Sequence, residues 1–152
     1  MANKAADYAK KHLEDVLAFF GINVEVVCRI EDDIIKLDVP STEHNGFLIG
    51  ERGQTLRALQ QLLQLSLQTQ DYETTRVSVD IADYKKQRAE RLAEQAHDWA
   101  LAVKADGEPM KLEPMNPVDR RTVHQTVNEV AGVETTSEGQ GRDRHVVIQP
   151  TA

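Results

Sequence analysis

Residues 46–56 read GFLIGERGQTL, and this stretch decides how the first half of the chain is interpreted. Its two glycines, Gly50 and Gly53, let the backbone turn sharply and let a sugar–phosphate chain approach without a Cβ in the way. The loop also opens a helix, whose free amides and positive dipole end favour an anion. Arg52 in the loop and Arg57, one turn into the helix, add positive charge. The stretch is therefore a candidate phosphate-binding loop.

A G-x-x-G pattern alone is a weak signal, because it also occurs as an ordinary turn between two helices. The segments around the loop decide between these interpretations. Apolar spacing predicts the order α-β-β-α-α-β. The expected elements are a helix at about 9–20, strands at 24–30 and 35–39, a short helical turn at 41–49, a helix at 54–69 and a strand at 77–81.

The second half of the chain predicts a different arrangement of helices and strands. The expected elements are a long helix at about 83–104, a short strand at 110–112, a helix after Asn116, and strands at 133–137 and 145–149. Asn116 is a typical helix cap, with Pro117 at the first helical position and Asp119 in the first turn. The sequence therefore predicts an α+β protein with two domains, residues 1–82 and 83–152. In the second domain, helices lie on a small three-stranded sheet.

Arg120 and His124 lie four residues apart, so they share one face of the predicted helix, about 40° from each other. Val123, Val127 and Val130 lie on the adjoining face and are expected to be buried. Arginines in the first turns of a helix oppose its dipole and cost stability, which indicates an anionic partner. The alternative is that Arg120 pairs with a nearby acid and His124 packs as a neutral histidine.

The first half resembles a type II KH domain over roughly residues 3–82. The resemblance rests on the Leu48-Ile49 step before the first glycine, the arginine in the loop, the long helix after it and the order of elements. It implies a three-stranded sheet and a grip on about four nucleotides of a single strand. The implied contacts with the nucleic-acid backbone are Gly50, Glu51, Arg52 and Gly53. Glu51 departs from the family pattern, since a carboxylate weakens contact with phosphate.

The second half resembles an R-three-H domain, whose name describes its motif of Arg, three residues and His. The resemblance covers roughly residues 83–150 and rests on LEPMNP at 112–117, RRTVH at 120–124 and RHVVIQP at 144–150. It implies binding of single-stranded nucleic acid, with Arg120 and His124 as the signature pair. A guanidinium offers a bidentate fork to phosphate. Further implied phosphate contacts are Arg121, Arg142 and Arg144.

A KH domain followed directly by an R-three-H domain is similar to the Jag (SpoIIIJ-associated) family of bacterial RNA-binding proteins. Many members carry a further N-terminal Jag domain, which this chain is expected to lack because it starts at the KH helix. The resemblance implies binding of single-stranded RNA, or of single-stranded DNA, in post-transcriptional regulation or as an RNA chaperone. The alternative is a protein-interaction module with degenerate RNA binding, which forms a homodimer or pairs with a second KH protein.

The composition argues against several other classes of protein. A net charge of −7 argues against a general nucleic-acid coat, so any such site is a local basic patch. The single cysteine, Cys28, excludes an internal disulfide and a multi-cysteine metal site. No apolar run approaches the roughly 18 residues of a membrane helix, and we expect a cytoplasmic protein without membrane insertion. No catalytic or cofactor motif occurs, so we expect no enzyme activity, no cofactor, no metal and no small-molecule substrate.

Overall fold

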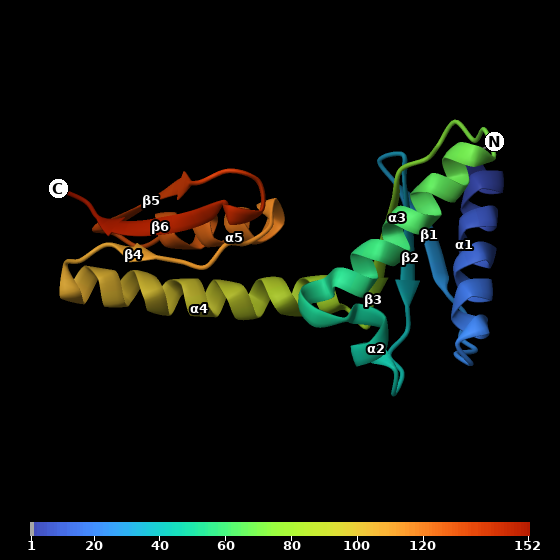
Figure 1. Cartoon of the computed structure of the whole chain (residues 1–152), viewed down its shortest axis with the longest axis horizontal. Helices are drawn as coiled ribbons and strands as arrows, with labels where there is room; N and C mark the ends of the chain where they lie inside the picture. Colours follow the sequence, from blue (N-terminus) through green and yellow to red (C-terminus); the bar gives the residue numbers. More distant parts are fainter. Residues whose placement is uncertain (1) are drawn as a thin grey trace. The chain divides into compact units, whose positions relative to one another are not determined.

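The computed structural model describes residues 2–152, and the chain forms two compact units, Met1–Lys85 and Lys86–Ala152. Each unit has its own three-stranded sheet (Figure 1). Each also has its own core of buried apolar side chains. Within the described residues, no helix is both long and apolar enough to cross a membrane. In the same part of the chain, no three His, Cys, Asp or Glu side chains gather closely enough to hold a metal ion.

The first unit has the predicted order of elements. It contains α1 (Ala2–Phe19), β1 (Val27–Glu31), β2 (Ile34–Val39), α2 (Asn45–Ile49), α3 (Gln54–Thr69) and β3 (Val77–Ile81). The middle strand of the sheet is β2, which runs antiparallel to β1 and parallel to β3. The expected order α-β-β-α-α-β and the three-stranded sheet are therefore confirmed.

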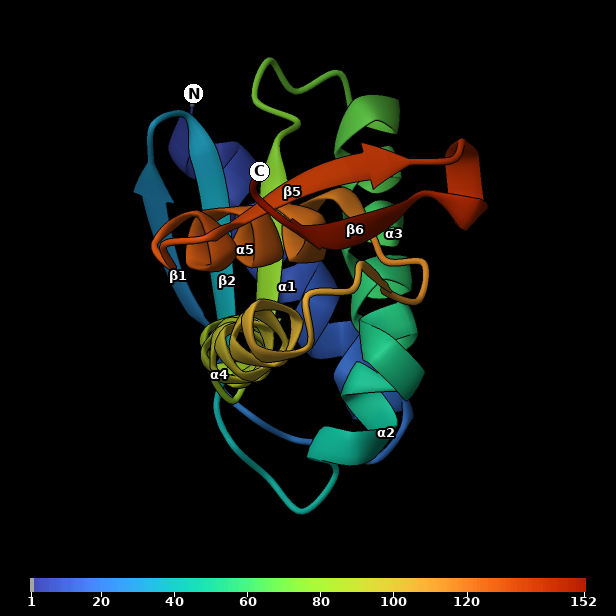
Figure 2. The ribbon, with the colours of Figure 1, turned by 90° about the vertical axis from the view of Figure 1, so that its left-hand side faces the viewer.

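The core of the first unit fixes where α3 begins. Alternate side chains of β2 and β3 are buried, so one face of the sheet packs against the helices. Leu13 and Leu17 of α1 and Leu63 and Leu67 of α3 are at most 1% exposed. Because α3 packs against β3 and α1, the start of α3 and the loop that precedes it have a fixed place in this unit (Figures 1 and 2).

The first strand begins later than the sequence predicts. A strand is expected over 24–30, whereas pairing starts at Val27, which lies opposite Asp38. By the same register Val26 lies opposite Val39, the last residue of β2, and Glu25 lies opposite Pro40, which has no backbone N–H to donate. Val26 is still fully buried. Cys28 is only partly buried and Ile30 is 39% exposed, so the apolar pattern predicted the burial in part and the start of the pairing incorrectly.

The second unit contains most of α4 (Tyr84–Asp106), together with β4 (Met110–Lys111), α5 (Pro117–Asn128), β5 (Val133–Glu138) and β6 (His145–Pro150). The middle strand is β6, which is antiparallel to both of its neighbours. Val123 and Val127 of α5 are fully buried and Val130 is partly buried, as predicted. The sheet and helices of this unit share one core, and the α+β fold class is confirmed.

The start of α5 follows the predicted capping pattern. Asn116 Oδ1 accepts a hydrogen bond of 2.9 Å from the backbone N–H of Asp119, and Pro117 occupies the first helical position. This cap sets where the first turn of α5 lies, and with it the position of Arg120 and of His124 one turn later.

Candidate nucleic-acid interface

The two loop glycines are required by the backbone and by the space around them. Gly50 has φ 72° and ψ −178°, and Gly53 has φ 75°. A Cβ at Gly50 would lie 2.3 Å from Thr55 Oγ1 and 3.0 Å from the Thr55 backbone nitrogen. A Cβ at Gly53 would lie 3.1 Å from a ring carbon of Tyr84. The loop between α2 and α3 is therefore a tight, defined turn, because only glycine fits both positions without strain.

The two basic residues near this loop lie together. Arg52 is exposed and has φ 53°, which places it in the left-handed region. Arg57 Nη1 donates a hydrogen bond of 2.9 Å to the carbonyl oxygen of Arg52. The guanidinium of Arg57 is thus folded back onto the loop. Glu51 is also exposed, so the loop presents one carboxylate beside its positive charges.

His124 is held through both ring nitrogens by two hydroxyls of β5. Its Nδ1 lies 2.6 Å from Thr135 Oγ1, and its Nε2 lies 2.6 Å from Ser137 Oγ. Burial lowers the pKa of His124 below its ordinary 6.5, and the nearby positive charges of Arg120 and Arg144 lower it further. The imidazole is therefore mainly neutral at pH 7. It can offer a ring face to a base, and it is not a cationic donor to phosphate.

Arg120 and Arg144 lie close enough to His124 for their charges to act on it, and each is anchored to the backbone. Arg120 is partly buried, and its Nη1 donates to the carbonyl oxygen of Met115 at 2.6 Å. Arg144 Nη1 donates to the carbonyl oxygen of Gly139 at 2.9 Å. We call Arg120, His124 and Arg144 the Arg–His cluster. Each guanidinium uses one donor for this anchor and carries five in total.

Two arginines predicted for this site lie outside the Arg–His cluster. Arg121 follows Arg120 on α5 and is exposed, about 100° further around the helix. Arg142 is exposed in a short 3₁₀ turn, Gly141–Asp143, between β5 and β6. Both are accessible to a ligand. The structure does not include either in the hydrogen-bonded arrangement around His124.

The acid nearest Arg120 in sequence is engaged by a different arginine. Asp119 is buried, and its carboxylate receives hydrogen bonds from Arg88 Nη2 at 2.6 Å and from Arg88 Nε at 3.3 Å. Asn116 Nδ2 adds a third hydrogen bond at 3.2 Å. Arg88 and Asn116 thus hold this neighbouring acid, while Arg120 is anchored to the carbonyl oxygen of Met115.

Sequence reasoning did not find the groups that position the cluster. The hydroxyls of Thr135 and Ser137 come from a strand 11 and 13 residues away from His124. Arg88 lies 31 residues before Asp119. The one available signal was the two-residue spacing of Thr135 and Ser137, which places both side chains on the same face of a strand.

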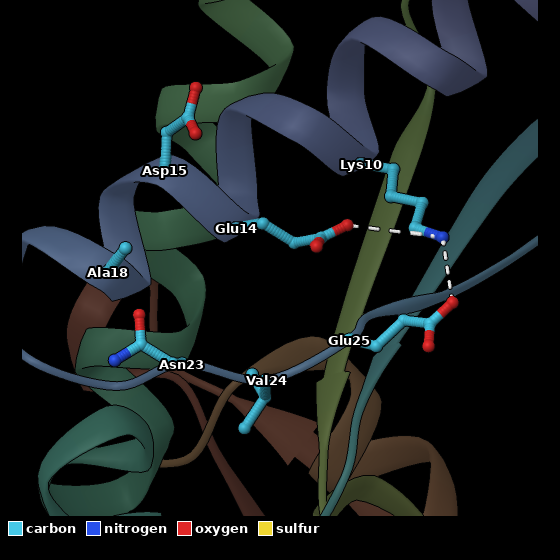
Figure 3. A pocket seen from close by; sticks show the side chains of 7 residues that line it. All are labelled: Lys10, Glu14, Asp15, Ala18, Asn23, Val24 and Glu25. Carbon is cyan, nitrogen blue, oxygen red and sulfur yellow. Dashed lines mark ion pairs between the residues drawn. The ribbon is translucent and has the colours of Figure 1, made fainter.

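One open hollow of the first unit has the wrong charge for nucleic acid. It has a volume of about 510 Å³ and lies between α1 and the segment before β1 (Figure 3). The carboxylates of Glu14, Asp15 and Glu25 line it, and Lys10 is paired with Glu14 at 4.0 Å and with Glu25 at 3.6 Å. Three acids against one ammonium repel a polyanion, so this hollow is not a candidate for phosphate binding.

Comparison with known proteins identifies the family. The family model of the R-three-H domain matches residues 90–150. The RNA-binding protein KhpB of Bacillus subtilis (strain 168) is 38% identical over 142 residues, which cover 92% of this chain and 68% of that protein. The chain belongs to the Jag family. The RNA-binding protein KhpB of Clostridium symbiosum is 34% identical over 143 residues, which cover 93% of this chain and 64% of that protein.

The match covers a smaller share of the length of other relatives. The RNA-binding protein KhpB of Streptococcus pneumoniae (serotype 2, strain D39) is 35% identical over 107 residues, which cover 70% of this chain and 33% of that protein. The chain therefore spans less than two thirds of the length of several of these relatives. These relatives of the Jag family are named as RNA-binding proteins.

Proposed function

We propose that this protein binds single-stranded RNA, through the loop at residues 50–53 and through the Arg–His cluster. The observation that carries the proposal is the construction of the cluster. Arg120 and Arg144 are fixed to backbone carbonyls beside a neutral His124, which is itself fixed by two hydroxyls. This arrangement combines anchored phosphate-binding groups with a flat ring on which a base can stack.

The glycine loop supports a second contact with the RNA backbone. It lies at the start of α3, a helix of 16 residues, whose first free amides and positive dipole end attract an anion. Arg52 is exposed in the loop, and Arg57 is folded onto it. Glu51 opposes this attraction, so we expect the loop to bind phosphate weakly and to orient the strand.

The acidic balance of the chain limits the number of phosphate contacts. With a net charge of −7, the protein gains little from nonspecific attraction to a polyanion. Arg121 and Arg142, which are exposed near the Arg–His cluster in sequence, are the proposed additional contacts. We infer that binding is selective and moderate, as suits a cytoplasmic protein of post-transcriptional regulation or an RNA chaperone. The relatives named as RNA-binding proteins support this proposal.

An apolar hollow favours protein interaction as a second candidate function. It has a volume of about 450 Å³ and is lined by residues of α1, α2 and α3. Phe20 and Phe47 are 54% and 58% exposed on its rim, with ring centroids 5.6 Å apart, and Leu62 is 43% exposed. An exposed apolar patch of this kind is typical of a protein interface, such as a homodimer or a complex with a second KH protein.

The salt dependence of binding separates the two functions. Fluorescence anisotropy with a labelled twelve-nucleotide single-stranded RNA would measure the dissociation constant from 50 to 300 mM salt. Each phosphate contact is expected to contribute a slope of roughly −0.7 to the logarithmic plot. The same series with single-stranded DNA tests the choice of nucleic acid. Absence of RNA binding at 50 mM salt, together with self-association that salt does not weaken, would favour the interaction module.

A further inference from the structure

Side-chain oxygens accept hydrogen bonds from backbone N–H groups on the outer edge of β3. This strand is the last of its sheet, so only β2 pairs with it. The N–H of Ala82 reaches Val39 on β2, and the parallel register makes alternate N–H groups point away from β2. Val79 is one of these, and its N–H donates to Gln60 Oε1 of α3 at 3.1 Å. The next outward N–H, that of Ile81, donates to Asp80 Oδ1 at 2.9 Å.

The partners of Gln60 fix the orientation of its amide. Its Oε1 accepts from the backbone N–H of Val79 and also from Lys85 Nζ at 3.3 Å. Lys85 Nζ is held in place by a second hydrogen bond of 2.9 Å to Ser78 Oγ. A backbone N–H can only donate, so the amide oxygen must face the strand. The amide nitrogen, with its two N–H donors, therefore faces away from it.

Gln60 lies about two turns along α3 from the glycine loop. Gln60 is three residues after Arg57, on the same side of α3 and about 60° around the helix. It is about 10 Å along the helix axis from Gly53, which is within the span of a few nucleotides. The Gln60 side chain is partly buried, and its hydrogen bonds within the described residues are those of its oxygen.

This orientation decides which bases Gln60 suits. A glutamine with both amide groups available pairs with adenine through its oxygen and its nitrogen together. Here the oxygen is occupied by Val79 and Lys85, and only donors remain. At position 4 of a pyrimidine or 6 of a purine, uracil and guanine present an acceptor oxygen, whereas cytosine and adenine present an exocyclic amine, which is a donor. We propose that Gln60 is a specificity-determining residue that selects uracil or guanine over cytosine and adenine, an inference that rests on the proposed function.

A purely structural role for Gln60 makes a different prediction. Covering the edge of β3 protects an exposed strand from pairing with other chains, and this requires only the amide oxygen. Base selection requires the amide nitrogen. The two roles therefore separate when the nitrogen is replaced and the oxygen is kept. Gln60→Glu does this, since one carboxylate oxygen can still accept from Val79 and Lys85.

The test compares binding of labelled octauridylate and octacytidylate RNA, which differ at position 4 of each base in having an oxygen or an amine. Wild-type protein is expected to bind the uridine octamer about fivefold more tightly. Gln60→Glu is expected to reverse this preference, because its outward group accepts a hydrogen bond. Gln61→Glu is the matched control, an exposed neighbour with the same change of charge, and it should weaken binding of both RNAs while keeping the preference for uridine.

The possible results distinguish the inference from the proposed function. Wild-type protein that binds neither RNA overturns both. Wild-type protein that binds both RNAs equally, or Gln60→Glu protein that keeps the wild-type ratio, overturns only the role of Gln60. If the added charge abolishes all binding by Gln60→Glu, the neutral Gln60→Met variant decides. It has neither donor nor strong acceptor and must bind the two octamers alike, and a retained preference for uridine overturns the inference.

Discussion

The guanidinium of Arg88 on α4 donates two hydrogen bonds to the buried carboxylate of Asp119 on α5. Its Nη2 lies 2.6 Å from Oδ2, and its Nε lies 3.3 Å from Oδ1. Removing Arg88 would leave this carboxylate with Asn116 as its remaining side-chain partner. The side chain of Arg88 is 34% exposed, so the cost is smaller than for a fully buried pair. Arg88→Ala is expected to lower the free energy of unfolding by about 1–3 kcal/mol.

Trp99, the only tryptophan of the chain, packs against the core of the second unit and reports on its unfolding. Urea unfolding followed by its fluorescence measures the effect of Arg88→Ala. Arg91→Ala, an exposed arginine on the same helix, is the control and should leave the midpoint unchanged. Equal midpoints for the two variants would contradict this account of the ion pair.

The lowered pKa of His124 predicts that acid destabilises the second unit. Burial is the main cause, and Arg120 and Arg144 add to it. In the unfolded chain the imidazole returns to its ordinary pKa of 6.5, so between the two pKa values the unfolded state binds more protons. The stability that neutral His124 contributes is therefore complete above about pH 6.5 and is lost as the pH falls toward the lowered pKa of the folded state.

Thermal unfolding between pH 7.5 and 5, followed by Trp99 fluorescence, measures this effect. His124→Gln keeps a polar partner for Thr135 and Ser137 and does not titrate, so its midpoint should fall less steeply with acid. His97→Gln, at an exposed position on α4, should follow the wild-type curve. A His124→Gln protein with the full wild-type dependence on pH would show that another group is responsible.

Arg120→Ala tests the Arg–His cluster. The variant loses the anchored guanidinium, and its affinity for single-stranded RNA is expected to fall roughly tenfold. The logarithmic salt slope should become shallower by roughly 0.7. Lys11→Ala removes the same charge from an exposed position on α1 and should change neither quantity strongly. Anisotropy titrations at several salt concentrations measure both, and equal losses from the two variants would indicate a general effect of charge.

Arg52→Asn tests the glycine loop without straining it. Asparagine tolerates the left-handed conformation that Arg52 adopts, so the charge is removed while the turn is kept. Affinity for single-stranded RNA should fall by a few fold, with an unchanged thermal midpoint. Gly50→Ala places a Cβ against Thr55 at positive φ and should instead lower stability by about 1–3 kcal/mol. Binding by Arg52→Asn that equals the wild type would remove Arg52 from the site.

Local signals in the sequence were sufficient for most of the elements. The predicted helix at 54–69 agrees with α3, because a glycine precedes it and its leucines recur at helical spacing. The start of α5 was predicted from Asn116 and Pro117, whose capping preferences act within one turn. The late start of β1 was missed, since pairing depends on what the partner strand offers at Pro40 and cannot be read from the strand itself.

The site was predictable only in its charged and glycine residues. Residue type and spacing alone were enough to predict a role for Gly50, Gly53, Arg120 and His124. The groups that orient them are ordinary polar residues on distant segments. Thr135 acts on His124 only because β5 lies beside α5. Contacts of this kind depend on the folded topology, so a single sequence gives no pattern from which to predict them.

Three arginines of the two sites, Arg57, Arg120 and Arg144, share one feature that affects the entropy lost on binding. Each donates through Nη1 to a carbonyl oxygen five residues earlier in the chain. A free arginine loses up to about 2 kcal/mol of side-chain conformational entropy when it is immobilised. Arg57, Arg120 and Arg144 are already ordered by folding. Their side chains therefore lose little further conformational entropy when they bind a nucleic acid.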